Sequence, residues 1–164
     1  MRRLVFALAI AIATVGVAGC GDDDNPTSPS GDITVFTVQL SALNEVPPVT
    51  NAETTARGTA VITVHKQSNT IDFAVSLNSF PTTTVLTAAH IHPGVAGVNG
   101  GVLIGTGLSS TNAPSMANGS ATFTFSGVTA SADNINQILA NPQNFYFNVH
   151  STLNGPGVMR GQLR

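Results

Sequence analysis

The chain begins with one long apolar run and continues, after a polar segment, in short stretches where apolar and polar residues alternate. Alternation with a period of two is typical of strands that bury one face. β-Branched and aromatic residues fill these stretches, and clusters of Gly, Asn, Ser and Pro separate them. We predict strands at residues 33–40, 57–65, 70–77, 86–92, 101–107, 120–126, 145–150 and 158–163.

One segment replaces the alternation with a helical pattern. Residues 132–140 place Ile135, Ile138 and Leu139 on one face of a short helix, and Ser131 is a suitable N-cap. Eight short strands separated by turns predict an all-β fold, a sandwich or barrel with two packed sheets. The helix is interpreted as a packing crossover. We expect these side chains in the core: Phe73, Val75, Ile91, Phe123, Phe125, Phe147 and Val149.

The beginning of the chain has the layout of a secretory signal. Arg2 and Arg3 precede the apolar run at residues 4–17, which is shorter than the roughly 20 residues of a membrane span. Small residues then lead to Cys20, and the sequence VAGC at this point resembles a bacterial lipobox. We therefore predict a signal peptide at residues 1–19 and a lipid anchor on Cys20. The alternative is an ordinary signal peptide in which the lone cysteine falls here by chance.

Residues 20–31 are interpreted as a flexible tether between the anchor and the domain. The segment after the cysteine holds three consecutive Asp, two Pro and no large apolar residue, so it cannot bury enough surface to offset the entropy of ordering. Gly21 rather than Asp follows Cys20, which favours the outer membrane in an envelope with two membranes. The predicted location is the cell envelope, with one domain at residues 32–164 on its periplasmic or surface face.

The charge of the chain limits its partners. Only 9% of residues are charged, and removal of Arg2 and Arg3 leaves four basic and eight acidic side chains, a net charge of −4. No basic patch or stripe marks a nucleic-acid binder. No cysteine follows Cys20, so packing, hydrogen bonds or a metal must stabilise the domain. We predict membrane attachment through Cys20 and no nucleic acid, and the sequence identifies no protein or polymer partner.

Three motifs occur in order along the domain: NEVPP at 44–48, AAHIHPG at 88–94, and YFNVHS at 146–151, which leads to RGQL at 160–163. In this order they resemble the CHRD domain, which is named for the repeats of chordin and also occurs singly in bacterial secreted proteins. The resemblance covers nearly all of residues 33–164.

The resemblance implies an immunoglobulin-like or superoxide-dismutase-like antiparallel β-sandwich (Greek-key barrel), partly through a faint likeness to copper/zinc superoxide dismutases. It implies no settled activity for bacterial members. In chordin the domain belongs to an extracellular antagonist of bone morphogenetic proteins, a partner that a bacterial lipoprotein would not meet. Function therefore has to be argued from the residues of the site.

Strand geometry groups the polar residues of these motifs on one face of each strand. Side chains two positions apart on a strand point the same way, so His90 and His92 lie together, opposite Ile91. The polar faces of the three strands carry His90, His92, Tyr146, Asn148, His150, Arg160 and Gln162. If these faces meet, His90, His92 and His150 converge, with the other polar groups nearby.

Three converging imidazoles predict a copper or zinc site, because imidazole ligates both ions at neutral pH. Three His with an open position are typical of a catalytic metal site rather than a closed structural one. We expect a surface-accessible site at His90, His92 and His150 whose affinity falls as the pH passes below about 6.5. The alternative is that these histidines donate hydrogen bonds to backbone carbonyls, or bond Asn148 or Glu45, and merely brace loops.

Two further charged residues stand in the motifs. Glu45 and Arg160 are expected to form a partly buried pair that locks the Pro47–Pro48 loop to the last strand, so together with Asn148 and Gln162 they would support the site structurally. His65, at the end of a hairpin strand, is expected to be a solvated edge residue.

The sequence therefore favours a cell-envelope lipoprotein with one CHRD domain, acting as an extracytoplasmic binding or structural module with a candidate histidine site for copper or zinc. The alternative is a copper redox enzyme that resembles superoxide dismutase, with Arg160 steering a small anion. A full bimetallic centre of that type would need more histidines than the three available here, so a binding module is favoured over an enzyme. No serine or cysteine nucleophile arrangement is present.

Overall fold

The structure, a computed structural model, describes residues 31–164, and the predicted signal peptide, Cys20 and nearly all of the tether lie outside these residues. Its strands are β1 (Ile33–Ser41), β2 (Arg57–His65), β3 (Thr70–Asn78), β4 (Leu86–Pro93), β5 (Ile104–Gly105), β6 (Ala121–Thr129), β7 (Phe145–Ser151) and β8 (Met159–Gln162). Its helices are α1 (Ala132–Ala140) and the short 3-10 turns η1 (Ala42–Asn44) and η2 (Pro142–Asn144). Within the described residues, no helix is both long and apolar enough to cross a membrane.

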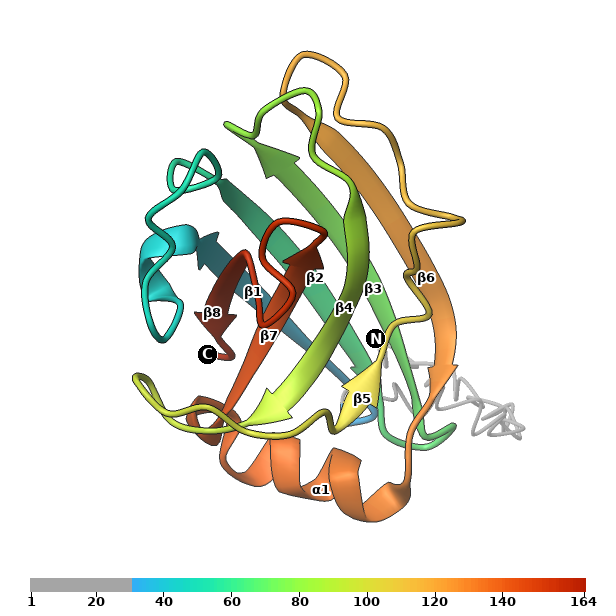
Figure 1. Cartoon of the computed structure of the whole chain (residues 1–164). Coiled ribbons are helices and arrows are strands. Elements are labelled where there is room, and N and C mark those ends of the chain that lie inside the picture. The colour runs from blue at the N-terminus through green and yellow to red at the C-terminus, as the bar shows by residue number, and fades with distance from the viewer. Residues whose placement is uncertain (1–30) are drawn as a thin grey trace, which may run out of the picture.

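All eight strands belong to one antiparallel sheet in the order β5-β4-β7-β8-β1-β2-β3-β6. Figure 1 shows this sheet curling so that its two halves face each other. Phe73 on β3 and Phe147 on β7 stack across the interior with ring centroids 5.7 Å apart, although three strands separate β3 from β7. The all-β sandwich or barrel is confirmed, but one continuous sheet replaces the two sheets that we expected. Twist accumulates from strand to strand, so a sheet of this width curls without breaking its hydrogen bonds.

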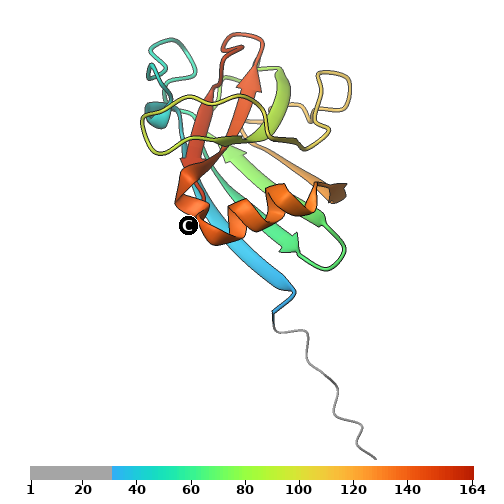
Figure 2. The same ribbon diagram turned by 90° about the horizontal axis from the view of Figure 1, so that it is seen from below.

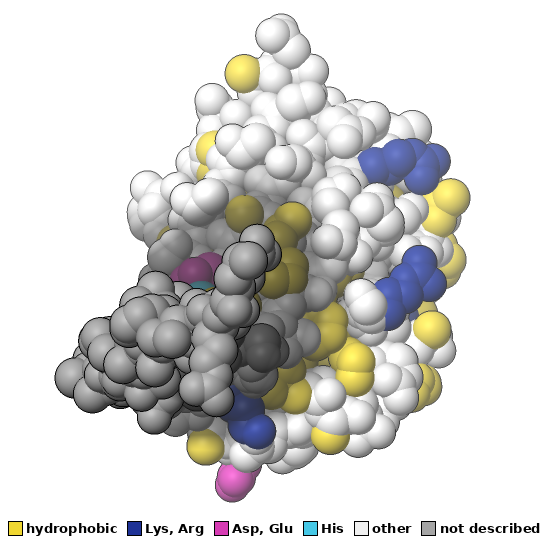
Figure 3. All heavy atoms as spheres, turned by 180° about the vertical axis from the view of Figure 1, so that it is seen from behind, with side chains coloured by type: hydrophobic (Ala, Val, Ile, Leu, Met, Phe, Trp, Pro, Cys, Tyr) yellow, Lys and Arg dark blue, Asp and Glu magenta, His cyan; other side chains and the backbone are white. Residues whose placement is uncertain are grey.

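The interior of the curl holds the apolar faces of the strands. Of the seven expected core side chains, all except Phe125 are buried. Phe125 is only partly buried, because β6 is an edge strand and the phenyl ring lies beside Gly107 in the segment that follows β5. On the outer face in Figure 3, the Lys and Arg side chains are separated from one another, and hydrophobic side chains lie between them.

Helix α1 begins and ends where the sequence predicted. The Ser131 hydroxyl accepts a hydrogen bond from the Asn134 backbone N–H at 3.1 Å, which caps the first turn. Ile135 and Ile138 are fully buried, and Leu139 is partly buried against the core. The helix links edge strand β6 to β7 and crosses one end of the curled sheet (Figure 2), so its predicted role as a packing crossover agrees with the structure.

The strand predicted at residues 101–107 is much shorter than expected, since β5 contains two residues. The carbonyls of Gly100 and Gly101 accept hydrogen bonds from the His92 ring and take no part in the sheet. Pairing begins only where Ile104 meets Ile91 and Gly105 meets His90. The glycine-rich segment before β5 is therefore a loop that contacts the polar face of β4.

Candidate metal centre

Two rows of polar side chains cross strands β4, β7 and β8 on one face of the sheet. In the first row, His90 pairs with Asn148, which pairs with Arg160 on the other side. In the second row, His92 pairs with Tyr146, which pairs with Gln162. Every residue of β7 is buried, so this face is an internal polar layer rather than an open surface. Strand pairing thus brings together the polar residues of the second and third sequence motifs, as expected.

The three histidines meet at one edge of this layer. One ring nitrogen from each of His90, His92 and His150 lies within 4.8 Å of the others. His90 Nδ1 is 3.1 Å from His150 Nε2, and the His90 ring lies edge-on to both other rings, with centroids 5.6 Å from His92 and 4.9 Å from His150. A copper or zinc ion held by all three rings would lie about 2 Å from each nitrogen, so the rings would have to turn toward a common point.

Backbone carbonyls fix the orientation of two of the rings. His92 Nδ1 donates to the carbonyls of Gly100 and Gly101 at 3.1 and 3.0 Å, and His150 Nδ1 donates to the carbonyl of Gly155 at 2.8 Å. These bonds leave Nε2 of both neutral rings unprotonated, and Nε2 of His150 lies at hydrogen-bond distance from Nδ1 of His90. Ligating histidines are commonly held in this way, with the second ring nitrogen bonded to a carbonyl. His92 Nε2 is enclosed and has no hydrogen-bond partner within the described residues.

Burial keeps the cluster uncharged. Removal from water, with added repulsion from His150 and His92, lowers the pKa of His90 from 6.5 to about 4. Burial also lowers the pKa of His92 and that of His150, although their bonds to backbone carbonyls act in the opposite direction. All three rings are therefore neutral at pH 7, the form that ligates metals. Protonation should compete with a metal well below the pH of 6.5 that we expected from the sequence.

The site is also less accessible than expected. His92 and His150 are only 5% and 9% exposed, and His90 is half-buried. The loop of residues 94–103 and the loop of residues 152–158 supply the carbonyls that contact the rings, so they lie over the cluster. The predicted surface-accessible site is thus an enclosed one.

Tyr146 is a member of the polar layer that the sequence analysis did not assign to the site. Its ring stacks on His92, with centroids 4.9 Å apart and planes 6° from parallel. Its hydroxyl accepts a hydrogen bond from the Gly100 N–H at 3.2 Å, which also holds the loop against β4. The Arg160 guanidinium lies 4.6 Å from the centroid of the ring in a cation–π contact. The period-two grouping of Tyr146 with Asn148 and His150 was the available signal.

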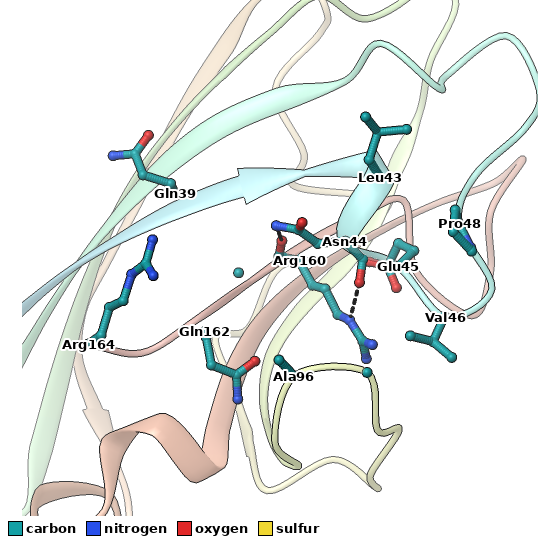
Figure 4. Close-up of a pocket in the computed structure, with 12 residues that line it drawn as sticks. Gln39, Leu43, Asn44, Glu45, Val46, Pro48, Ala96, Arg160, Gln162 and Arg164 are labelled. Atoms are coloured by element: carbon teal, nitrogen blue, oxygen red, sulfur yellow. Dashed lines mark hydrogen bonds between the residues drawn. The ribbon is translucent and has the colours of Figure 1, made fainter.

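Arg160 and Glu45 do not form the direct ion pair that we expected. Within residues 31–164, the one ion pair closer than 4 Å joins His65 to Asp72. Arg160 instead donates through Nε to the carbonyl of Asn44 at 2.7 Å (Figure 4), and through Nη1 to the carbonyl of Val98 and to Oδ1 of Asn99. Arg160 therefore does tie the loop after β1 to β8, but through oxygens other than the Glu45 carboxylate.

Glu45 is a buried carboxyl with little compensation. It is 6% exposed, and its Oε1 lacks a hydrogen-bond partner within the described residues, as does Nη2 of Arg160. Burial raises the pKa of Glu45 to about 7, even though the positive charge of Arg160 and hydrogen bonds from Val46 and Asn148 act to lower it. The carboxyl is thus close to half protonated at neutral pH.

Asn148 and Gln162 support the layer as expected. Asn148 is 3% exposed and lies under Gly157, where an added Cβ would come within 2.6 Å of the amide nitrogen. Gly157 has a φ of +150°, so close packing and backbone conformation both require glycine there. Gln162 donates through Nε2 to the carbonyls of Gly94 and Gln143, which fastens the loop of residues 94–103 and η2 to β8.

Glu53 is a buried residue that the sequence analysis missed. It is 1% exposed, and its carboxylate accepts hydrogen bonds from the Thr84 hydroxyl at 2.7 Å, the Ser151 hydroxyl at 2.6 Å and the Asn154 amide at 2.5 Å. The last two donors belong to the end of β7 and to the loop whose Gly155 carbonyl orients His150. No periodicity or motif marks position 53, because its partners come from segments that are distant from it in the sequence.

His65 and a large hollow lie away from the three histidines of the cluster. His65 is partly buried and lies 2.9 Å from Asp72 on β3, so it is a paired residue rather than a solvated one. The backbone N–H of Gly127 and the ring of His65 lower the pKa of Asp72. A hollow of about 480 Å³ lies beside Arg160 and Glu45 and contains none of the three histidines (Figure 4).

The fold and the polar layer define a small all-β module with a histidine cluster. The sequence profile of the CHRD domain matches residues 36–163, and the chain belongs to the CHRD domain family. Comparison with the curated proteins and with the solved structures found no match.

Proposed function

We propose that this CHRD domain is a binding module that holds one copper or zinc ion through His90, His92 and His150. The observation that carries the proposal is the convergence of three neutral imidazoles, two of which donate through Nδ1 to backbone carbonyls and so keep an unprotonated Nε2 available as a ligand. Histidines that only braced loops would need no more than the hydrogen bonds from Nδ1 to the carbonyls. That role does not explain why Nε2 of His92 is buried without a hydrogen-bond partner among the described residues.

Copper is expected before zinc. Imidazole sites bind Cu²⁺ more tightly than Zn²⁺ in the Irving–Williams order. A role in binding is favoured over catalysis because His92 and His150 are enclosed, and Arg160, which would steer an anion in a redox enzyme, instead holds loop oxygens.

The cellular setting of the module is part of the same proposal and rests on the sequence alone. A lipid on Cys20 would anchor the chain in the cell envelope, with the outer membrane favoured where two membranes are present. The tether of residues 20–31 would then separate the domain from the bilayer.

The proposal is tested by calorimetric titration of untagged protein that carries Cys20→Ser, which removes the one thiol able to bind copper. One strong site for Cu²⁺ is expected at pH 7, and the His90→Ala/His92→Ala double variant should lose it. His65→Ala is the matched control, since His65 lies outside the cluster and should bind copper like the parent protein. Equal binding by the double variant would show that the histidines only brace the loops.

A further inference from the structure

The donor set of the histidine cluster is uncharged. Within residues 31–164, the group of potential ligands that lie within 4.8 Å of one another consists of the three imidazoles, with no carboxylate or thiolate among them. Neutral donors contribute no negative charge, so the net charge of an occupied centre equals the charge of the ion itself. This property distinguishes the cluster from sites in which a carboxylate or thiolate offsets part of a dication's charge.

The nearest charged group in the polar layer is a cation. Arg160 lies in the same row as His90, with only Asn148 between them, and is 3% exposed. Its guanidinium contacts the face of Tyr146, whose ring in turn stacks on His92. Because β7 lies between β4 and β8, the cation approaches Tyr146 from the side away from the histidines.

Negative charge near the cluster is weak. Glu45 is the carboxyl nearest to Arg160 in the layer, and it is not among the potential ligands of the cluster. Glu53 accepts hydrogen bonds from Thr84, Ser151 and Asn154 and has no cation within 4 Å among the described residues, so its oxygens are engaged by these donors. An ion at the histidines therefore sits in an enclosed, neutral site with a guanidinium on one flank.

We propose that this centre, compared with free imidazole in water, shifts its preference toward Cu⁺ and away from divalent ions because of charge, while still binding Cu²⁺. The inference rests on the proposed function, since it concerns an ion at the same three histidines. The cost of moving an ion from water into a poorly polarisable interior grows with the square of its charge, so a dication loses about four times as much solvation as a monocation. Repulsion from Arg160 adds a term that is twice as large for the dication. Cu⁺ is a closed-shell ion whose coordination three imidazoles can complete.

Zn²⁺ is the suitable reference ion, because it is also a closed-shell d10 ion with no geometric preference of its own. Cu⁺ affinity is measured anaerobically against a chromogenic Cu⁺ chelator with ascorbate present, and Zn²⁺ affinity against a zinc chelator, both on untagged Cys20→Ser protein. The preference for Cu⁺ over Zn²⁺ should exceed that of free imidazole in water by at least about tenfold. A preference equal to or below that of imidazole overturns the inference.

A matched pair of variants isolates the effect of charge. Asn148→Asp places a carboxylate of nearly the same size next to His90, and Asn148→Leu removes the amide without adding charge. Asp should shift the preference toward Zn²⁺ by between about 10-fold and 100-fold relative to wild type, whereas Leu should leave it nearly unchanged. An equal shift in both variants overturns the inference, because it would arise from packing.

Failure of this inference can be distinguished from failure of the proposed function. Should Asn148→Asp fail to fold, as judged by circular dichroism, the wild-type preference against imidazole decides the question by itself. If Zn²⁺ binds at the histidines more tightly than Cu⁺, this inference fails and the proposed function stands. If His90→Ala/His92→Ala binds both ions as wild type does, the proposed function fails.

Discussion

The ring of Tyr146 lies parallel to that of His92, with centroids 4.9 Å apart. Tyr146 is also the single tyrosine of a chain that contains no tryptophan, so the ultraviolet emission of the protein comes from this one ring, apart from weak phenylalanine emission. Cu²⁺ bound at the histidines should therefore quench tyrosine emission strongly, whereas Zn²⁺, which has a filled d shell, should not. Quenching that survives in the His90→Ala/His92→Ala variant would place the copper elsewhere.

The metal-free protein should lose stability in mild acid. The folded state holds the pKa of His90 near 4, whereas the unfolded chain takes up a proton on this ring near pH 6.5. The free energy of unfolding should thus fall as the pH decreases from about 6.5 to about 4, and His92 and His150 act in the same direction. Urea unfolding with a chelator present measures this, and His90→Asn should show a shallower dependence. An unchanged slope in that variant would contradict the pKa shift.

Glu45 should make the opposite contribution. Its pKa is raised to about 7 in the folded protein, so the stability it provides is complete below about pH 4.5 and is lost as the pH rises to about 7. Glu45→Gln removes this loss, and its amide offers a donor to Oδ1 of Asn148, which lacks one. The variant should gain stability relative to wild type between pH 5 and pH 8 in parallel unfolding curves. A constant difference across this range would show that Glu45 does not titrate there.

Glu53 should support both folding and the metal centre. Glu53→Gln replaces one acceptor with an NH₂ group that faces hydroxyl and amide donors, which should lower the free energy of unfolding by roughly 1–3 kcal/mol. Because Ser151 and Asn154 hold the loop that orients His150, copper affinity should fall as well. Asp133→Asn, in the exposed first turn of α1, is the control for loss of one acidic charge and should change neither quantity. Copper affinity unaffected by Glu53→Gln would limit Glu53 to a stabilising role.

Cys20→Ser tests the anchor. Wild-type protein should partition into detergent because its cysteine carries acyl chains, whereas the variant should stay unprocessed or become soluble. Phase partitioning and mass spectrometry of the mature chain measure this. Wild-type protein found in the aqueous phase with an unmodified cysteine would contradict the predicted lipoprotein.

The sequence predicted most strongly those features that repeat along the chain. Strand β2 (Arg57–His65) and helix α1 (Ala132–Ala140) have the predicted bounds, because alternation and a capped apolar face are local patterns. The convergence of His90, His92 and His150 also followed from period-two geometry, once β4 and β7 proved to be neighbours.

Features that depend on contacts between loops could not be predicted from the sequence. The role of Glu53, the oxygens that Arg160 contacts and the carbonyls that orient His92 arise where distant segments meet, and no periodic pattern encodes such meetings. The depth of the histidine cluster was missed for the same reason, since the covering loops are rich in glycine and look exposed in sequence. Strand β5 shortened because Gly100 and Gly101 bond His92 instead of a neighbouring strand.

The pairing of β1 has a mechanical consequence. β1 lies beside β2 through nine consecutive residue pairs, from Ile33 with His65 to Ser41 with Arg57. A pull on residue 33 directed along the strand therefore loads these pairs in shear, all at once, rather than opening them one after another. At about 3.3 Å per residue the loaded seam is roughly 26 Å long. If the amino-terminal end of the protein is held by a membrane, flow or the drag of a bound partner would apply this force. The nine residue pairs between β1 and β2 would then bear it together.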